Sequence, residues 1–332
     1  MSAKYLVVGG AGYIGSHMVK ALLQAGHDVV ILDDLSTGYR DAVVGGEFIR
    51  GSLADERMLD SVFTSHRFAA VLHFASFIQV GESVAQPAKY YANNVANTLN
   101  LLNAMVRHGV RDFVFSSTAA IFGEPQYVPI DEKHTVAPIN PYGVSKAMVE
   151  QVLRDYDHAY GLKSVCLRYF NACGADPQGE LGERHQPETH LIPLALQTLS
   201  GRRESLTMFG RDYDTPDGTC IRDYVHIVDL CQAHLLALDH LRVSGTSAAF
   251  NLGNGGGFSV AAVIAAVERV TGGNVPVVEG TRREGDPARL VADSRLARKI
   301  LGWKPHYAEL ELIIAHAWAW EQKQAAHSTA ID

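Results

Sequence analysis

The chain has 332 residues, 47% of them hydrophobic and 20% charged, with a formal net charge of −7 and a pI near 6.1. This composition excludes a disordered chain, and the negative balance argues against nucleic acid as the main partner. The length suits two domains, or one large α/β domain with an annex.

The first half of the chain alternates between short apolar segments and helical patterns. Residues 13–25 and 90–108 each carry apolar side chains on one face and are followed by a glycine, as helices often are. The apolar segments show little alternation, as expected for strands that are buried on both faces, and they span residues 5–10, 28–34, 69–76, 112–118 and 164–170. We therefore expect β-α-β units and a doubly wound parallel sheet of the α/β class.

A glycine-rich turn, GGAGYIG at residues 9–15, lies between the first strand and the first helix. Gly9 permits the tight turn, Gly12 lets the backbone approach a pyrophosphate, and Gly15 lets the helix pack closely on the strand. In this strand–turn–helix setting the pattern strongly indicates a Rossmann-type dinucleotide site. Tyr13 and Ile14 lie inside the motif, and we expect them at the cofactor as well.

The second predicted strand ends in Asp33 and Asp34. A carboxylate about 20 residues after the glycines can accept hydrogen bonds from the adenosine ribose, and it would repel the additional phosphate of NADP. The nearby arginine, Arg40, comes only later in the loop. We therefore expect NAD as the cofactor and Asp33 as the ribose ligand, with Asp34 either a further contact or a solvated turn carboxylate.

The segment NPYGVSKAMVE, residues 140–150, predicts the start of a helix, with Asn140 as N-cap and Pro141 at the first helical position. Tyr142 and Lys146 then lie on one face, one turn apart. A nearby ammonium group, the positive end of a helix and an oxidised nicotinamide all lower the pKa of a phenol. The pair is suited to removing a proton from a hydroxyl while a hydride moves to NAD.

A third catalytic group is expected where the segment FSST ends a strand, because ligands bind at the carboxyl ends of parallel strands. Thr118 and Ser117 offer hydroxyls there. After residue 171 the regular alternation of strand and helix patterns ends. Residues 172–190 and 210–222 have the composition of long functional loops.

Two domains are therefore expected. We expect a dinucleotide-binding domain over residues 1–171, to which a segment near 223–252 returns, and a smaller substrate-binding domain over residues 172–332.

No run of about 20 apolar residues is present, so no membrane partner is expected. The first strand begins by about residue 4, which leaves no room for a cleavable leader, and a cytoplasmic location is expected. Cys166, Cys173, Cys220 and Cys231 form no C-x-x-C pair, which indicates free thiols. His185 and His190 are close in sequence, but Pro187 separates them and we expect no metal site.

The chain resembles the extended short-chain dehydrogenase family, and within it the UDP-glucose 4-epimerases, over nearly its whole length. The segments that carry the resemblance are GGAGYIGSH, HFASFIQVGES, YYANNV, FSSTAAIFGE, PYGVSK, LRYFNACGA, GTCIRDYVHI and RREGDPARLVAD. The resemblance implies that Tyr142 is the acid/base, that Lys146 is its partner on the nicotinamide ribose, and that Thr118 is a catalytic hydroxyl. It also implies a homodimer through the helices near 90–108 and 141–160.

The resemblance further assigns two sets of binding residues. It implies cofactor contacts at Phe74, Ala75, Asn93, Ser116 and Tyr169. It implies that the UDP-sugar is bound by Asn171, Leu191, Arg222, Arg283, Asp286 and Leu290. The arginines suit a bidentate grip on phosphate.

Three positions depart from the family pattern. Ile78 stands where some relatives have a lysine near the cofactor, and Ser52 where members often have an aspartate that contacts the adenine. His190 stands where some relatives have an asparagine.

Ala119 and Ala120 bear on the reaction type. Dehydratases of this family place Asp and Glu after the threonine, and decarboxylases usually use an acid there, whereas methyl groups cannot perform acid–base chemistry. We expect an isomerase that performs NAD-dependent 4-epimerisation of UDP-glucose and UDP-galactose through a transient 4-keto sugar. The intermediate bulk of Leu290 leaves N-acetylhexosamine and pentose substrates open. A dehydratase or decarboxylase, and a non-catalytic dinucleotide sensor, are the weaker candidates.

Overall fold

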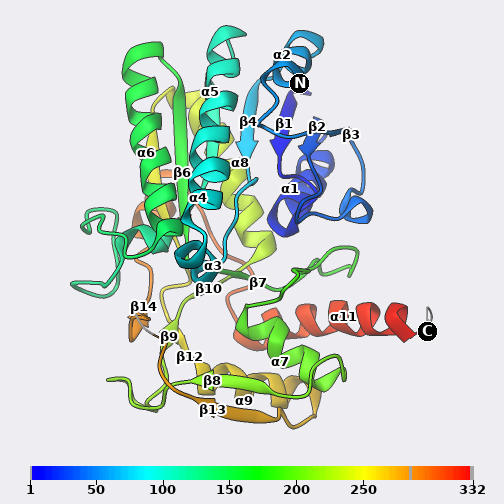
Figure 1. Cartoon of the computed structure of the whole chain (residues 1–332), viewed down its shortest axis with the longest axis vertical. Coiled ribbons are helices and arrows are strands. Elements are labelled where there is room, and N and C mark those ends of the chain that lie inside the picture. Colours follow the sequence, from blue (N-terminus) through cyan, green and yellow to red (C-terminus); the bar gives the residue numbers. More distant parts are fainter. Residues whose placement is uncertain (1, 284–285, 330–332) are drawn as a thin grey trace.

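The computed structural model describes residues 2–283 and 286–329 (Figure 1). A parallel sheet with helices on both faces forms the larger part of the molecule, and a smaller group of helices and short strands lies against one end of it. The predicted fold class, a Rossmann-type doubly wound α/β fold with a smaller C-terminal part, is confirmed.

The central sheet has seven strands in the order β11-β6-β5-β4-β1-β2-β3, and all neighbours pair in parallel. Its strands are β1 (Lys4–Val8), β2 (Asp28–Asp33), β3 (Glu47–Arg50), β4 (Ala70–His73), β5 (Asp112–Thr118), β6 (Lys163–Tyr169) and β11 (Ala248–Leu252). The chain direction across the sheet reverses between β1 and β4. Beyond the carboxyl ends of these two strands a doubly wound sheet forms its ligand crevice.

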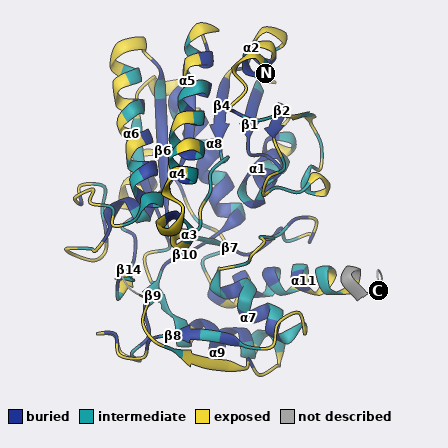
Figure 2. Ribbon diagram, viewed as in Figure 1, coloured by how far each residue is buried: buried dark blue, intermediate teal, exposed yellow. Residues whose placement is uncertain are grey.

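Helices cover the sheet on both faces, with α1 (Tyr13–Gln24) and α8 (Ile227–Ser244) on one side and α2 (Glu56–Ser65), α5 (Asn97–Arg107) and α6 (Pro141–Tyr160) on the other. The two-residue repeat of β1 explains both layers. Tyr5 and Val7 pack with α1 and α8, whereas Leu6 and Val8 pack with α2, α5 and α6. Figure 2 shows the sheet as the buried layer between these helices.

The helix that carries the Tyr-Lys motif begins as the sequence predicts. The side chain of Asn140 accepts a hydrogen bond from the Gly143 N–H at 2.9 Å, and Pro141 is the first residue of α6. The expected helix at 90–108 differs, because it consists of α4 (Pro87–Tyr90), a π-helical turn at Tyr91–Ala96 and then α5. π-Helical turns recur at functional sites, and this one contains Asn93.

The smaller part is built around α7 (Leu191–Leu199), α9 (Val260–Thr271) and α11 (Leu310–Thr329), which share one apolar cluster. Its short strands form pairs and a three-stranded sheet: β8 (Leu206–Phe209) with β13 (Val277–Gly280), and β12 (Phe258–Ser259), β9 (Ile221–Arg222) and β14 (Arg289–Leu290). β7 (Asn171–Cys173) pairs with β10 (Tyr224–His226), and β10 leads into α8 and back to the edge strand β11.

The remaining short helices are η1 (Arg40–Ala42), α3 (Val80–Ala85), η3 (Ala119–Phe122) and α10 (Arg295–Ile300). Within residues 2–283 and 286–329, no helix combines the length and the apolar content needed to cross a bilayer.

Candidate active site

A cleft opens at the carboxyl ends of β1, β2 and β4, where the strand order reverses. Seven of the predicted cofactor residues line it: Gly9, Gly12, Asp33, Asp34, Phe74, Ala75 and Asn93. Ser52, one of the departures from the family pattern, also lines this cleft, whereas Ile78 is 38% exposed. The structure thus brings together residues that are up to 84 positions apart (9 to 93) at the place where a dinucleotide binds in this fold.

The three glycines of the turn are needed for different reasons. Gly9 has φ +79°, and a Cβ there would lie 2.5 Å from the backbone nitrogen of Ala75. A Cβ on Gly15 would collide with the carbonyl oxygen of Gly9. A Cβ on Gly12 would meet only that same oxygen, at an ordinary 3.5 Å. The fold therefore requires Gly9 and Gly15, while the bare backbone of Gly12 leaves room for a ligand in the cleft.

Asp33 connects the end of β2 to the glycine-rich turn. Its Oδ2 accepts a hydrogen bond from the Ala11 N–H at 2.9 Å, and its Oδ1 accepts one from the Leu35 N–H at 2.8 Å. Burial raises the pKa of Asp33, and these two backbone bonds oppose the rise. Each oxygen keeps a lone pair for a ribose hydroxyl. Asp34 is exposed and accepts from the Ser36 N–H at 2.8 Å, as a turn carboxylate does.

The side chains of Tyr13 and Ile14 are engaged away from the cleft floor. The Tyr13 hydroxyl donates to the carbonyl oxygen of Gly174 at 2.7 Å, and Ile14 packs against the α1–α8 core. Both residues nevertheless stand in the first turn of α1, where backbone N–H groups have no partner within the helix. These N–H groups, rather than the side chains, are available to a phosphate.

Lys146 is almost fully buried, with 1% of its surface exposed. Its Nζ donates to the hydroxyl of Ser76 and to the carbonyl oxygen of Ser116, both at 2.8 Å, and lies 4.8 Å from the ring centroid of Phe115. Burial lowers the pKa of Lys146 to about 7, and Glu150 opposes the fall. Sequence reasoning missed Ser76, although its place just after β4 is the position where ligand-contacting residues gather.

Tyr142 lies in the first turn of α6 and forms a hydrogen bond with Thr118, the last residue of β5. Burial raises the pKa of Tyr142, and the bond with Thr118 opposes the rise. The lowered pKa expected from the Tyr-Lys spacing is therefore not a property of these side chains alone. Desolvation of the phenol outweighs the hydrogen bond, and the ammonium group of Lys146 directs its bonds to Ser76 and Ser116.

The consecutive serines at the end of β5, Ser116 and Ser117, direct their hydroxyls to opposite faces of the sheet. The hydroxyl of Ser116 bonds to that of Tyr169, whose pKa is raised by burial. Ser117 points the other way and donates to Glu150 Oε1 at 2.6 Å, so it is not the hydroxyl beside Tyr142. The partner of Glu150 is Arg168, which donates two hydrogen bonds to the carboxylate, at 2.9 and 2.6 Å. This buried pair lies one turn beyond Lys146 and has no local sequence signal.

Most of the predicted substrate residues form one group, whereas Leu191 packs in a different cluster. Arg222 forms an ion pair with Asp286, and its main chain pairs in register with Leu290. The Arg283 guanidinium lies 4.0 Å from the ring centroid of Phe209. The Asn171 amide donates to the main-chain oxygen of Asp223, at 2.8 Å.

Leu290 ties this group to the catalytic turn, because it packs against the cluster that contains Ala119, Ile121 and Phe122. Leu191 is the first residue of α7 and packs at the border of the α7–α9–α11 cluster. The structure thus joins Arg222, Asp286 and Leu290 to the turn after Thr118. Arg283 belongs with them through its main chain, because its carbonyl oxygen accepts a hydrogen bond from the Asp286 N–H at 3.3 Å.

A doubly wound sheet, a glycine-rich cleft at its reversal point and a Tyr-Lys pair beside that cleft define a dinucleotide-dependent enzyme of the short-chain dehydrogenase type. Residues 5–253 match the NAD dependent epimerase/dehydratase family, and the chain belongs to that family.

Relatives align over almost the entire chain. It is 52% identical to a UDP-glucose 4-epimerase of Halalkalibacterium halodurans, over 96% of this chain and 95% of the relative. The solved structure of UDP-glucose 4-epimerase from Brucella ovis in complex with NAD is 48% identical and covers 96% of this chain and 98% of its own, with a TM-score of 0.93. The Bifidobacterium longum enzyme in complex with NAD+ and UDP is 38% identical over 96% and 98%, with a TM-score of 0.92.

Proposed function

We propose that this chain is an NAD-dependent isomerase that interconverts UDP-glucose and UDP-galactose by inverting C4 of the sugar. The observation that carries the proposal is the placement of Tyr142, Thr118 and Lys146 at the carboxyl edge of the sheet, beside the glycine-rich cleft. Relatives that align over nearly the whole chain, at about half identity, bear the name UDP-glucose 4-epimerase.

The cleft fits NAD on its own geometry. Gly12 leaves backbone open to a pyrophosphate, the first turn of α1 presents N–H groups, and Asp33 has lone pairs for ribose hydroxyls. Phe74, Ala75 and Asn93 complete the lining. When bound there, NAD would accept the hydride from C4 of the sugar and, once reduced, would return it.

The side chains of the protein would transfer the proton and hold the reacting groups in place. Tyr142, as phenolate, removes the proton of the sugar 4-hydroxyl and later gives it back. Thr118 hydrogen-bonds the phenol and stabilises its anionic form. Lys146 is held by hydrogen bonds to Ser76 and Ser116, and its ammonium group would serve the phenol and the ribose of the bound nicotinamide.

The 4-keto sugar must rotate in the site between the two hydride transfers, so that its opposite face meets the cofactor. Arg222 and Arg283 would hold the diphosphate through their guanidinium groups. The ion pair with Asp286 supports this role for Arg222, because it fixes the orientation of the guanidinium. Asn171 and Leu191 would border the nucleotide, and Leu290 the sugar. A firm hold on UDP with a loose hold on the hexose permits the keto sugar to present its opposite face.

Elimination of water is disfavoured by the turn after Thr118. Ala119 is buried, and the Ala120 N–H donates to the Thr118 hydroxyl oxygen at 3.1 Å. Neither methyl group can protonate or deprotonate a sugar. A dehydratase or decarboxylase is therefore the weaker candidate, and the non-catalytic sensor is weaker still because Tyr142 and Lys146 are both in place.

The domain division, the oligomer and the location complete the proposal. We assign the cofactor to residues 1–171 with the segment near 223–252, since α8 and β11 belong to the central sheet's layers, and the UDP-sugar to the rest of 172–332. A homodimer would form through α5 and α6, and α6 exposes the apolar side chains of Met148 and Tyr160. The four cysteines are free and buried, which suits the cytoplasm.

The direct test is incubation of the purified protein with UDP-galactose and no added NAD. The proposal predicts UDP-glucose as product, because the cofactor is regenerated in each turnover and stays bound. Release of a dehydrated keto sugar would instead identify a dehydratase. A protein that binds NAD but converts no UDP-sugar would be a sensor. Parallel incubations with UDP-N-acetylgalactosamine and a UDP-pentose measure the sugar range.

A further inference from the structure

The loop between β7 and α7 gathers two imidazoles and two carboxylates at one point. Glu183, His185, Glu188 and His190 each offer one nitrogen or oxygen atom, and these four atoms all lie within 4.8 Å of one another. The spacing along the chain did not predict this, because Pro187 interrupts the segment. The turn around Pro187 brings both histidines onto the same pair of carboxylates.

The separations of these atoms suit a tetrahedral metal site. Nδ1 of His185 is 3.3 Å from one oxygen of Glu183 and 3.3 Å from one of Glu188. Nδ1 of His190 is 2.8 Å and 3.0 Å from oxygens of the same two residues. Ligand atoms around a tetrahedral Zn²⁺ with bonds of about 2.1 Å stand about 3.4 Å apart. The four contacts given are shorter than this by about 0.1 to 0.6 Å, and all four ligand atoms lie within 4.8 Å of one another. Glu188 contacts His185 with one oxygen and His190 with the other, so the ion would be bound after a small adjustment that brings one of these oxygens to it.

The burial of the Glu183 and Glu188 carboxylates favours a cation bound beside them. The side chains of Glu183 and Glu188 are 6% and 5% exposed, and a buried carboxylate requires a cation. Glu188 is also held in place, because its Oε1 accepts hydrogen bonds from the N–H groups of Thr189 and His190 at 2.8 and 2.9 Å. Such outer hydrogen bonds orient metal ligands.

We propose that Glu183, His185, Glu188 and His190 bind one divalent transition-metal ion, with Zn²⁺ as the best match to two imidazole nitrogens and two carboxylate oxygens. Four protein ligands close the coordination sphere, which is the pattern of a structural rather than a catalytic zinc site.

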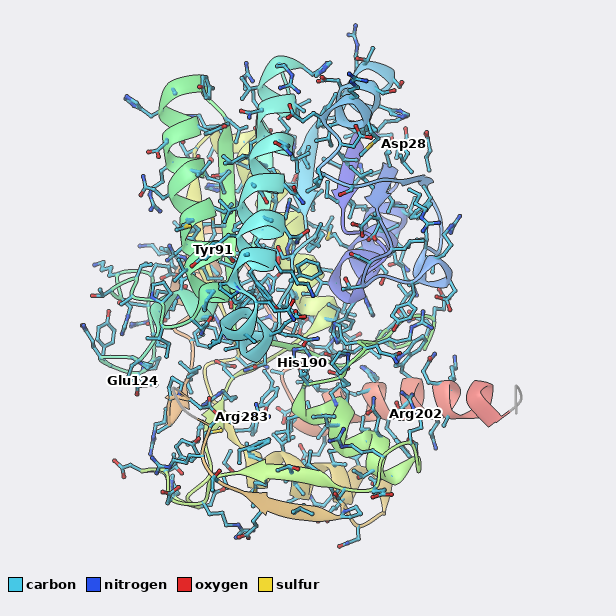
Figure 3. The ribbon with its side chains drawn as sticks, viewed as in Figure 1. Asp28, Tyr91, Glu124, His190, Arg202 and Arg283 are labelled. Atoms are coloured by element: carbon cyan, nitrogen blue, oxygen red, sulfur yellow. The ribbon has the colours of Figure 1, made fainter. Side chains whose placement is uncertain are left out.

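The ion would fasten a loop that contacts three parts of the molecule. Arg184, between two of the ligands, pairs with Asp41 and lies 3.7 Å from the ring centroid of Tyr39. The carbonyl oxygen of Glu183 accepts a hydrogen bond from the Trp320 indole of α11 at 3.2 Å. His190 directly precedes α7, and Figure 3 shows it between the sheet layers and the smaller part.

The competing arrangement is a pair of ion pairs, in which each imidazole is protonated and no metal enters. The two arrangements use the same atoms, so the test must count the metal. Untagged protein is dialysed against a chelator, incubated with ZnCl₂, desalted and analysed by mass spectrometry for zinc. The proposal predicts one zinc per chain. It also predicts that CoCl₂ gives the visible absorption bands of tetrahedral Co²⁺ and that zinc raises the thermal midpoint.

Two variants and a control assign the ion to this loop. His190→Asn keeps a polar side chain and removes the imidazole, and Glu188→Gln keeps the size of the side chain. Both should weaken zinc binding at least about 100-fold, since changes outside the ligand set alone cost 10–100-fold. His66→Asn is the matched control, because His66 faces only Glu47 among ion-pair partners of the described residues, and it should retain one zinc.

Either of two results would overturn the proposal. One is wild-type protein that holds no stoichiometric zinc and gives no tetrahedral cobalt spectrum. The other is a zinc content in both loop variants equal to that of wild type and His66→Asn. Near-UV circular dichroism checks that the variants are folded. All readouts are independent of UDP-sugar turnover, so their failure and that of the proposed function are separable.

Discussion

The Nζ atom of Lys146 lies 2.8 Å from the hydroxyl oxygen of Ser76, which joins α6 to the segment that follows β4. In the proposed mechanism the lysine is the partner of the acid/base tyrosine. Ser76 is one of only two hydrogen-bond acceptors that its Nζ atom reaches within the described residues. Ser76 also lines the cofactor cleft. The serine therefore acts as a positioning residue for the ammonium group.

Ser76→Ala should lower kcat by about 10-fold, because a buried donor left without a partner costs about 1–3 kcal/mol. The rate of UDP-galactose conversion measures this effect, and NAD content is determined on the same samples. Ser65→Ala, in the exposed end of α2, is the control and should behave as wild type. Equal kcat values for Ser76→Ala and wild type would show that the contact does not position the lysine.

Thr118→Val should move the pH dependence of kcat/KM toward higher pH. The hydrogen bond between Thr118 and Tyr142 lowers the pKa of the phenol against the effect of burial. Without that bond the pKa of Tyr142 rises further, less phenolate is present at a given pH, and the acid limb of the profile shifts to higher pH. Thr118→Ser keeps the hydroxyl and should keep the limb near its wild-type position. A downward shift in Thr118→Val would contradict the assigned direction.

Gly12→Ala and Gly15→Ala separate cofactor binding from folding. A methyl group on Gly15 collides with the Gly9 carbonyl oxygen, so this variant should lose about 2 kcal/mol or more of unfolding free energy. Gly12→Ala has room in the protein and should fold with near wild-type stability, yet bind NAD at least about 10-fold more weakly because the methyl group occupies ligand space. Urea denaturation and NAD titration give the two quantities. Unchanged NAD affinity in Gly12→Ala would refute the proposed position of the pyrophosphate.

Arg168→Met should destabilise the fold by about 3–5 kcal/mol, because it leaves Glu150 as a buried carboxylate without its cation. The double variant Arg168→Met/Glu150→Met should recover part of this loss. Arg242→Met removes an exposed ion pair with Asp239 and should cost less than about 1 kcal/mol. The free energies come from urea denaturation. A cost for Arg168→Met no larger than that for Arg242→Met would show that the buried pair adds nothing to stability.

Local sequence rules were sufficient to predict much of the fold and the geometry of the glycine-rich turn. The N-cap of α6 at Asn140 and the glycine-rich turn follow from side chains a few positions apart, and the structure shows both. The alternation of strands and helices likewise predicted the parallel sheet. These features depend on short-range geometry that every β-α-β unit repeats.

The features that could not be predicted from the sequence depend on contacts between residues that are far apart along the chain. Ser76 and Lys146 are 70 residues apart, and the direction of the Tyr142 pKa is set by burial, which no spacing reveals. The π-helical turn that carries Asn93 interrupts a pattern that predicted an unbroken helix. The Glu183–His190 cluster forms because a proline-containing turn folds back on itself.

The central claim is that Tyr142 transfers the proton, and Tyr142→Phe tests it most directly. The phenylalanine keeps the ring and removes only the hydroxyl, so NAD content and unfolding free energy should stay near wild-type values. Conversion of UDP-galactose to UDP-glucose should fall about 10²–10⁴-fold, the contribution expected of a general acid–base group. Turnover within about twofold of wild type, with NAD still bound, would contradict the account.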